Sequence, residues 1–364
     1  TMMKAQKRFL GPINSTKKYA ILLYLSDMKA KDAKGFGALE HPTSTTVVMP
    51  EMMGLEMLQE QLKDVVSHEF FHIVTPLTIH SNEIQYFDFN NPQMSEHLWM
   101  YEGVTEYFAN LFQVNQGLID EKEFFERMAG KIAQSRQMND NMSFTKMSKN
   151  VLNPPYKEQY LNVYQKGALI AMCMDILIRE NSNGQKGILS LMQELSKEYG
   201  TTKAFKDEEL FDKITALTYP AVGEFLKNHV AGETPIPYEQ YFAKMGVTEA
   251  TIEIAGNPFL KGQTQPYITV NPATKEIMIL PDTELNVFMT TLGLKNNDTL
   301  LAFNGKDYNL DNIYDLIMAS MNWKDGDAMT VKFKRDGKEQ TVKGKVVMPK
   351  EKQDGYQSTD ATKK

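Results

Sequence analysis

The feature that most constrains the fold of this chain is a His-Glu-x-x-His motif, which runs from His68 to His72. Two residues four positions apart lie on the same face of an α-helix, about 5–6 Å from each other. Both imidazoles can then bind one Zn²⁺ ion, because zinc–histidine bonds are about 2.0–2.1 Å long. Glu69 lies next to the first histidine, where a carboxylate can polarise a metal-bound water. The motif therefore predicts a helix that carries most of a hydrolytic zinc site.

The residues around the motif favour this interpretation. Hydrophobic residues recur at roughly helical spacing from Leu55 to Val74, and Pro76 is a stop signal just beyond them. A motif this short also arises by chance, and then the two histidines would be buried packing residues and Glu69 a surface carboxylate. Further ligands and catalytic groups elsewhere in the chain must decide between the two interpretations.

A catalytic zinc ion usually has three protein ligands and one position open to water. Glu102 is the best candidate for the third ligand, since it is a lone carboxylate on an otherwise uncharged face of a predicted helix. Burying such a carboxylate without a partner is costly, and a metal ion would satisfy it. Ser95 is the expected N-cap of that helix. His97 is the main rival ligand, although it lies about 140° around the helix from Glu102.

Glu106 lies one helical turn after Glu102 and could hold the second ring nitrogen of a ligand histidine, which would fix the tautomer of that ring. The alternative is a solvated carboxylate on a helix surface. The remaining histidines, like His97 itself, are expected at surface or capping positions. They are His41, His80 and His229.

Two further segments have catalytic features. Gly37 and Ala38 would let a substrate backbone approach closely, and an edge strand can hydrogen-bond to an extended peptide. Glu40 could then pair with the amine at the N-terminus of the substrate. Tyr164 opens a strongly apolar helix, and its phenol could donate a hydrogen bond to an oxyanion. Taken alone, a glycine-rich turn and a packing tyrosine would be the simpler explanations.

In this order, the segments resemble the motifs of the glycyl aminopeptidase family, which are gluzincin metallopeptidases with a C-terminal PDZ domain. The chain is similar more distantly to aminopeptidase N and leukotriene hydrolase. The family's Gly-Gly-Leu-Glu-His segment resembles residues 37–41, Gly-Ala-Leu-Glu-His. Its Tyr-Glu-Gly segment with the third ligand resembles residues 101–103, and its motif with the transition-state tyrosine resembles residues 164–167. The resemblance covers nearly the whole chain.

The resemblance implies a role for each matched residue. The implied zinc ligands are His68, His72 and Glu102. Glu69 would be general base and then general acid, Tyr164 would stabilise the oxyanion, and Glu40 would hold the α-amine of the substrate. The chain departs from the family in two respects. It begins shortly before residue 37, so we expect the family's N-terminal β-rich domain to be absent, and Glu106 stands where the family often has a small residue.

Composition narrows the class of protein. The chain has 364 residues, a net charge of −6 and one cysteine, Cys173. That length suits two or three domains, and without a dense basic patch nucleic acid is not an expected partner. A single cysteine excludes an intramolecular disulfide. The longest early apolar run, Tyr19 to Leu25, is too short to span a bilayer and predicts a buried strand.

The order of the patterns predicts an α+β fold. Residues 1–50 are strand-rich and residues 55–250 mostly helical, which suits a thermolysin-like (gluzincin) catalytic domain over residues 1–254, with zinc at the junction. Strand-like runs follow, with hairpin signals at Asn304-Gly305 and Asp336-Gly337. They resemble a small, β-rich PDZ-like domain over residues 255–350. The polar residues 351–364 are expected to be disordered.

These observations predict a zinc-dependent peptidase that acts on peptide or protein substrates. An aminopeptidase is favoured because of Glu40, and a preference for small N-terminal residues such as Gly or Ala is implied by the resemblance alone. The alternatives are a zinc endopeptidase, an epoxide or ester hydrolase, and a non-catalytic protein that binds peptides through the PDZ-like domain. The sequence leaves open the oligomeric state and the compartment, which would be periplasm or cell envelope after removal of a signal peptide and cytoplasm otherwise.

Overall fold

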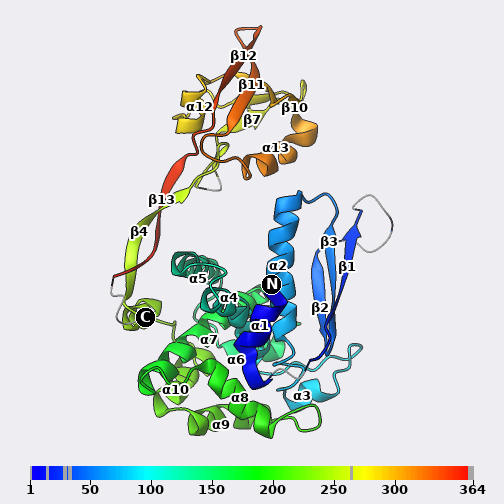
Figure 1. Cartoon of the computed structure of the whole chain (residues 1–364), viewed down its shortest axis with the longest axis vertical. Coiled ribbons are helices and arrows are strands. Elements are labelled where there is room, and N and C mark those ends of the chain that lie inside the picture. The colour runs from blue at the N-terminus through cyan, green and yellow to red at the C-terminus, as the bar shows by residue number, and fades with distance from the viewer. Residues whose placement is uncertain (1, 14–15, 28–30, 32–34, 263–264, 360–364) are drawn as a thin grey trace. The chain divides into compact units, whose positions relative to one another are not determined.

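The computed structural model describes residues 2–13, 16–27, 31, 35–262 and 265–359. Helices and strands are mixed, as the sequence predicts. The chain forms two compact units, one of Thr1–Ala250 with Gly355–Lys364 and one of Thr251–Asp354 (Figure 1). Among the described residues, none of the helices is long and apolar enough to cross a membrane.

The first unit contains a three-stranded sheet in the order β1-β3-β2. Strand β3 (Ser44–Pro50) pairs in parallel with β1 (Ala20–Ser26) and antiparallel with β2 (Gly37–His41). Alternate β3 side chains point to one face, where Val47 and Met49 pack with Val66 of helix α2. Helix α2 therefore lies along the sheet (Figure 1), and β2 is an edge strand among the described strands.

Strand β1 is more exposed than its sequence predicts. The run does form a strand, but the side chains of residues 21–25 are 39–56% exposed rather than buried. The small hydrophobic cluster under the sheet is built from β3, α2 and their neighbours, and β1 adds no residue to it. Within the described residues β1 is thus an edge strand without a second covering layer.

Helix α2 (Leu55–Phe71) carries the His-Glu-x-x-His motif, which confirms the predicted helix. It ends three residues earlier than Val74, because His72 is its C-cap and turns follow. The end of α2 enters the main core of the unit, where Phe70 and Phe71 are fully buried. Burial of these rings fixes the helix end that bears the motif.

Glu102 lies in a π-helix, η2 (Trp99–Val104), that continues into α4 (Thr105–Asn115). Ser95 is not its N-cap as predicted. Its hydroxyl instead donates to Asp207 at 2.8 Å and accepts from the backbone N–H of His97. The expected cap failed because the helix begins only at Trp99, with Leu98 at the N-cap position.

Helix α7 (Asn162–Asn181) crosses η2 at two glycines. A Cβ atom added to Gly103 would lie 2.4 Å from the backbone carbon of Gly167, closer than real contacts allow. The two backbones can therefore touch only because both residues lack a side chain. This contact brings the helix that carries Glu102 against the helix that carries Tyr164.

The remaining helices complete the core of the first unit. One of them, α1, lies within residues 1–50, which were predicted to be strand-rich, and its Phe9 and Leu10 pack into the main core. The Asp120 side chain caps α5 as predicted, accepting from the N–H of Glu123. The helices are α1 (Met2–Leu10), α3 (Asn82–Gln85), α5 (Glu121–Ser135), α6 (Phe144–Asn150), α8 (Ile188–Glu198), α9 (Leu210–Leu217), α10 (Pro220–Phe225) and α11 (Tyr238–Lys244).

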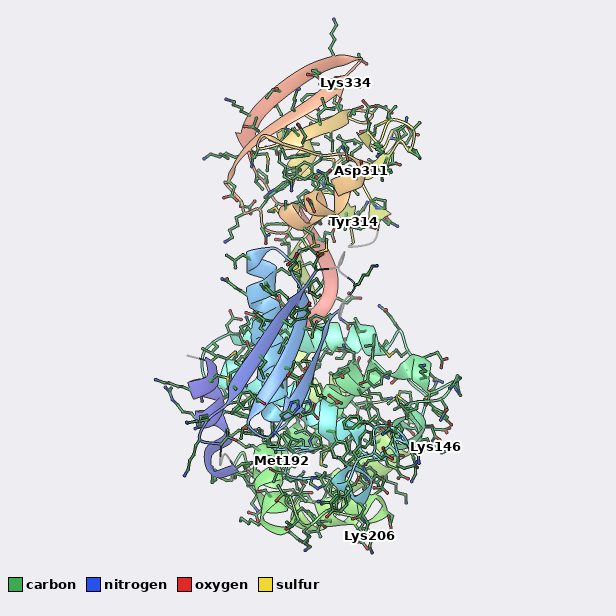
Figure 2. All side chains as sticks on the ribbon, turned by 90° about the vertical axis from the view of Figure 1, so that its right-hand side faces the viewer. Lys146, Met192, Lys206, Asp311, Tyr314 and Lys334 are labelled. Atoms are coloured by element: carbon green, nitrogen blue, oxygen red, sulfur yellow. The ribbon has the colours of Figure 1, made fainter. Side chains whose placement is uncertain are left out.

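The second unit is built on a sheet in the order β12-β11-β9-β8-β7, with β10 paired to β9. The predicted hairpin turns at Asn304-Gly305 and Asp336-Gly337 are confirmed by their positive φ angles. Asp311 and Tyr314 lie on its surface (Figure 2). Its strands are β5 (Leu260–Lys261), β6 (Gln265–Pro266), β7 (Ile268–Val270), β8 (Ile277–Ile279), β9 (Thr299–Phe303), β10 (Lys306–Asp307), β11 (Ala328–Arg335) and β12 (Lys338–Lys345). Its helices are α12 (Val287–Thr291) and α13 (Ile313–Ser320).

The polar segment after residue 350 is ordered rather than disordered as far as it is described. Strand β13 (Lys350–Ser358) pairs with β4 (Val247–Ala255). Tyr356 is buried, and its ring centroid lies 4.1 Å from that of Phe242. The composition is polar because β13 exposes most of its side chains, while one buried aromatic ring and the backbone pairing hold it.

Candidate metal centre

The helical spacing of His68 and His72 places their ring centroids 4.8 Å apart. The Nδ1 atom of His72 lies 3.0 Å from the backbone oxygen of Thr75, and Nδ1 of His68 lies 2.8 Å from Oε2 of Glu106. Both acceptors call for a proton on Nδ1. The two Nε2 atoms therefore remain as the ring atoms that can bind a metal.

Glu102 reaches both of these nitrogens with one oxygen. Its Oε2 atom lies 3.1 Å from Nε2 of His68 and 3.7 Å from Nε2 of His72. Ligand atoms of a tetrahedral Zn²⁺ ion with bonds near 2.05 Å are about 3.3 Å apart. The two separations bracket this value, so the three side chains fit one zinc ion. Tetrahedral zinc would leave a fourth position for water.

The charges of the centre favour a bound cation. Burial lowers the pKa of His68, but hydrogen bonds to Glu102 and Glu106 outweigh it and raise the pKa to about 10. Burial raises the pKa of Glu102, but the charge of His72 and the hydrogen bond to His68 bring it below its usual value. Without a metal, a proton on His68 therefore offsets part of the carboxylate charge, and a divalent ion would take over this role.

Glu69 has the features of a base. It is buried, and its Oε2 atom has no hydrogen-bond partner among the described residues. Burial raises the pKa of this carboxyl group, the charges of His72 and His68 lower it, and the charge of Glu40 raises it again. Nine buried side-chain atoms of the described residues lack a partner, and the oxygen of Glu69 is the one among them that belongs to a cluster with two histidines. It fits a site in which the second partner of Glu69 is a water or a substrate group.

Tyr164 lies close to the first histidine of the motif. Its ring centroid is 5.6 Å from that of His68. Burial, followed by the charge of Glu102, raises the pKa of the phenol, so the hydroxyl keeps its proton and can donate it. The hydroxyl of Tyr160 lies 3.2 Å from that of Tyr164. The sequence analysis missed Tyr160, although its position one helical turn before Tyr164 was a usable signal.

Glu40 belongs to the same site. It lies on β2 and is half-buried, and its charge raises the pKa of both Glu69 and Tyr19. Along the same strand, Gly37 and Ala38 pair with Val48 and Val47 of β3. Among the described strands β2 pairs with β3 alone, so its other edge can receive an extended peptide.

Tyr19 is a second residue that the sequence did not single out. Its hydroxyl donates to the backbone oxygen of Glu69 at 3.2 Å, and its ring lies edge-on against Phe70. The contact joins residues 50 positions apart, so only the folded chain shows it.

The rival ligand His97 does not reach the centre. It is buried, its Nε2 lies 2.9 Å from the backbone oxygen of Asp207, and its Nδ1 accepts from the indole of Trp99. His80 is also buried, between Pro76 and Gln85. Of the expected surface or capping positions, the surface position is therefore wrong for these two histidines, and each ring bonds to a backbone oxygen inside the fold. The other two lie closer to solvent: His41 is exposed, and His229 bonds to the backbone of Thr234.

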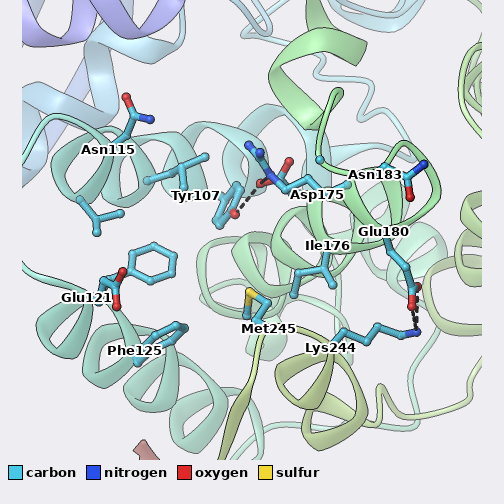
Figure 3. Close-up of a pocket in the computed structure, with 15 residues that line it drawn as sticks. Tyr107, Asn115, Glu121, Phe125, Asp175, Ile176, Glu180, Asn183, Lys244 and Met245 are labelled. Atoms are coloured by element: carbon cyan, nitrogen blue, oxygen red, sulfur yellow. Dashed lines mark hydrogen bonds and ion pairs between the residues drawn. The ribbon is translucent and has the colours of Figure 1, made fainter. Parts of the chain in front are cut away.

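A cavity of about 610 Å³ lies away from this centre, between α4, α5, α7 and α11 (Figure 3). Four of its charged groups pair with one another, Arg179 with Asp175 and Lys244 with Glu180. None of the predicted site residues lines it. The cavity therefore offers no support for the chemistry of the motif.

Two imidazoles, a carboxylate and an adjacent unpartnered glutamate are the side-chain set of a metallopeptidase centre. The sequence profile of the M61 glycyl aminopeptidase family matches residues 61–170, which include the motif, Glu102 and Tyr164. The predicted resemblance to the glycyl aminopeptidase family is thus confirmed over these residues.

The fold has a counterpart among solved structures. An aminopeptidase N family protein from Idiomarina loihiensis is similar over all of this chain, with 19% sequence identity and a TM-score of 0.61. This chain covers 64% of that protein, just under two thirds of its length. At this identity the likeness shows the fold alone. No curated protein matches the chain.

Proposed function

We propose that this protein is a zinc-dependent aminopeptidase that removes small N-terminal residues, such as Gly or Ala, from peptides. The observation that carries the proposal is the position of Glu102, whose Oε2 lies 3.1 and 3.7 Å from the free nitrogens of His68 and His72. The unpartnered oxygen of Glu69 lies beside them. The family match supports the peptidase class, and the preference for small residues rests on that match alone.

The side chains divide the reaction between them. His68, His72 and Glu102 would hold Zn²⁺, which lowers the pKa of water from 15.7 towards about 7. Glu69 takes the proton of the attacking water as general base and passes it to the leaving amine as general acid. Tyr164 donates its hydroxyl proton to the carbonyl oxygen of the scissile bond as negative charge develops there.

Glu40 would make the enzyme an exopeptidase. A peptide lying along the edge of β2 would place its free α-amine near this carboxylate, and the ion pair would set the register of cleavage. The second unit would be a PDZ-like domain appended to a thermolysin-like catalytic domain. A zinc endopeptidase is the second candidate function, because it needs the same metal centre but no partner for an α-amine.

Metal analysis and two matched peptides test this proposal. The purified protein should contain about one zinc per chain, and it should cleave a free peptide far faster than its N-acetylated form. The Glu40→Gln variant should lose much of this discrimination, because a neutral amide cannot pair with an ammonium group. Equal cleavage of both peptides would establish the endopeptidase, and a protein without metal or hydrolysis would refute the proposal.

A further inference from the structure

Glu106, the carboxylate behind His68, has hydrogen-bond partners at both of its oxygens. Its Oε2 faces Nδ1 of His68 at 2.8 Å. Its Oε1 accepts from the ammonium of Lys131 at 2.7 Å and from the side-chain amide of Asn110 at 3.2 Å. The side chains of Lys131 and Glu106 are only 12% and 21% exposed. The lysine comes from α5, so the contact links a separate helix to the metal centre.

The contacts continue behind Lys131. Arg127, one turn earlier on α5, donates to the amide oxygen of Asn110 at 3.2 Å and pairs with Glu123 at 2.7 Å. These groups line a cavity of about 370 Å³ on the side of Glu106 away from the histidines. Water in that cavity could hydrate Glu106 and draw it away from His68 if Lys131 were absent.

We propose that Lys131 is a positioning residue of the metal centre, an inference that rests on the proposed zinc function. Its ammonium fixes the Glu106 carboxylate so that one oxygen always faces Nδ1 of His68. That hydrogen bond keeps the proton on Nδ1 and turns Nε2 towards the metal.

Charge balance gives the lysine a second effect. Glu102 and Glu106 lie one helical turn apart and contact the two nitrogens of the same ring. Without a cation beside it, Glu106 would be a second carboxylate free to rotate towards the metal and to compete with Glu102 as ligand. Lys131 satisfies Glu106 on the far side, and so leaves Glu102 as the carboxylate that faces the metal.

The test is the zinc dissociation constant of the full chain, measured by competition with a chelator. Lys131→Met should weaken zinc binding roughly 10- to 100-fold, the usual cost of losing a group that orients a metal ligand. Lys131→Arg keeps a donor and should stay within a few-fold of wild type. Lys122→Met is the matched control and should have no effect, because Lys122 is an exposed lysine on the same helix that pairs with Glu126.

Two further readouts separate positioning from general damage to the fold. In a Glu106→Gln background, Lys131→Met should weaken zinc binding little further, because the two residues act through one contact. The visible spectrum of the Co²⁺-loaded protein should change in Lys131→Met and be restored in Lys131→Arg. Lys131→Gln replaces Lys131→Met if the latter fails to fold.

The outcomes distinguish this inference from the proposed function. If wild type binds zinc and the folded Lys131 variants bind it equally well, the role of Lys131 is refuted while the zinc peptidase stands. If wild type binds no zinc, both are refuted.

Discussion

Two buried carboxylates, one in each unit, are treated in opposite ways by the fold. Asp298 in the second unit is 1% exposed and accepts from Arg335 with both oxygens and from the backbone N–H of Lys295. Glu69 in the first unit is 7% exposed, and one of its oxygens has no partner among the described residues. Both carboxylates lose hydrogen bonds to water on burial. Protein donors replace these hydrogen bonds at both oxygens of Asp298, but not at both oxygens of Glu69.

The difference shows which buried polar groups serve stability and which serve chemistry. A carboxylate whose oxygens are all satisfied has no capacity left for a reactant, and its loss should affect unfolding. A carboxylate with a free oxygen beside two imidazoles weakens the fold, and its loss should affect reaction rates.

The sharpest way to break this comparison is the substitution Glu69→Gln. The amide is nearly the same size but cannot accept a proton, so we expect peptide turnover to fall by about 10³-fold or more. Bound zinc should stay near one per chain, because His68, His72 and Glu102 remain. Thermal unfolding should be unchanged or shifted upward. If turnover persists, Glu69 is not the base, and if wild type shows no turnover at all, the peptide-binding alternative is favoured.

Asp298→Ala tests the other side of the comparison. It removes hydrogen bonds to a partly exposed arginine and to a backbone amide, and we expect a loss of about 2 kcal/mol in the stability of the second unit. Hydrogen exchange of the amides in β9 and β11 measures this loss without reference to the first unit. Cleavage of short peptides should be unchanged.

An exposed ion pair in the same unit supplies the control. Lys275 and Asp311 pair at 2.8 Å, but more than half of each side chain is exposed. Asp311→Asn should therefore alter stability by less than about 0.5 kcal/mol. If Asp298→Ala and Asp311→Asn changed the stability of the second unit equally, the hydrogen bonds of the buried Asp298 would stabilise the unit no more than an exposed ion pair does.

Local chemistry explains what the sequence could predict. The helix around His68 follows from hydrophobic spacing, and the turns at Asn304-Gly305 and Asp336-Gly337 follow from residues that tolerate positive φ. Gly103 and Gly167 lie within segments that the sequence analysis identified. Why glycine is needed there, a close contact between two helix backbones, is visible only in the folded structure.

Long-range contacts explain the rest. The buried ring of His97 finds its acceptor in Asp207, 110 positions later, and the hydroxyl of Ser95 donates to the same aspartate. Nothing in the sequence distinguishes Lys131 from the other lysines. Only the packing of α5 near α4 places it against Glu106. The exposure of β1 is of the same kind, since an apolar run predicts a strand but not whether another layer covers it. The ligand roles of His68, His72 and Glu102 remain predictions.

The smallest expected effect on turnover concerns the two tyrosines. If the Tyr164 hydroxyl donates to the substrate oxygen, the 3.2 Å contact requires Tyr160 to be the donor to Tyr164. A hydroxyl that accepts one hydrogen bond becomes a better donor in the next. Tyr160→Phe should therefore lower kcat roughly 3- to 10-fold with little change in KM, the value of about one neutral hydrogen bond. In a Tyr164→Phe background the same substitution should have no further effect on kcat. If Tyr160→Phe lowered kcat equally in both backgrounds, Tyr160 would contact the substrate itself and would not act through Tyr164.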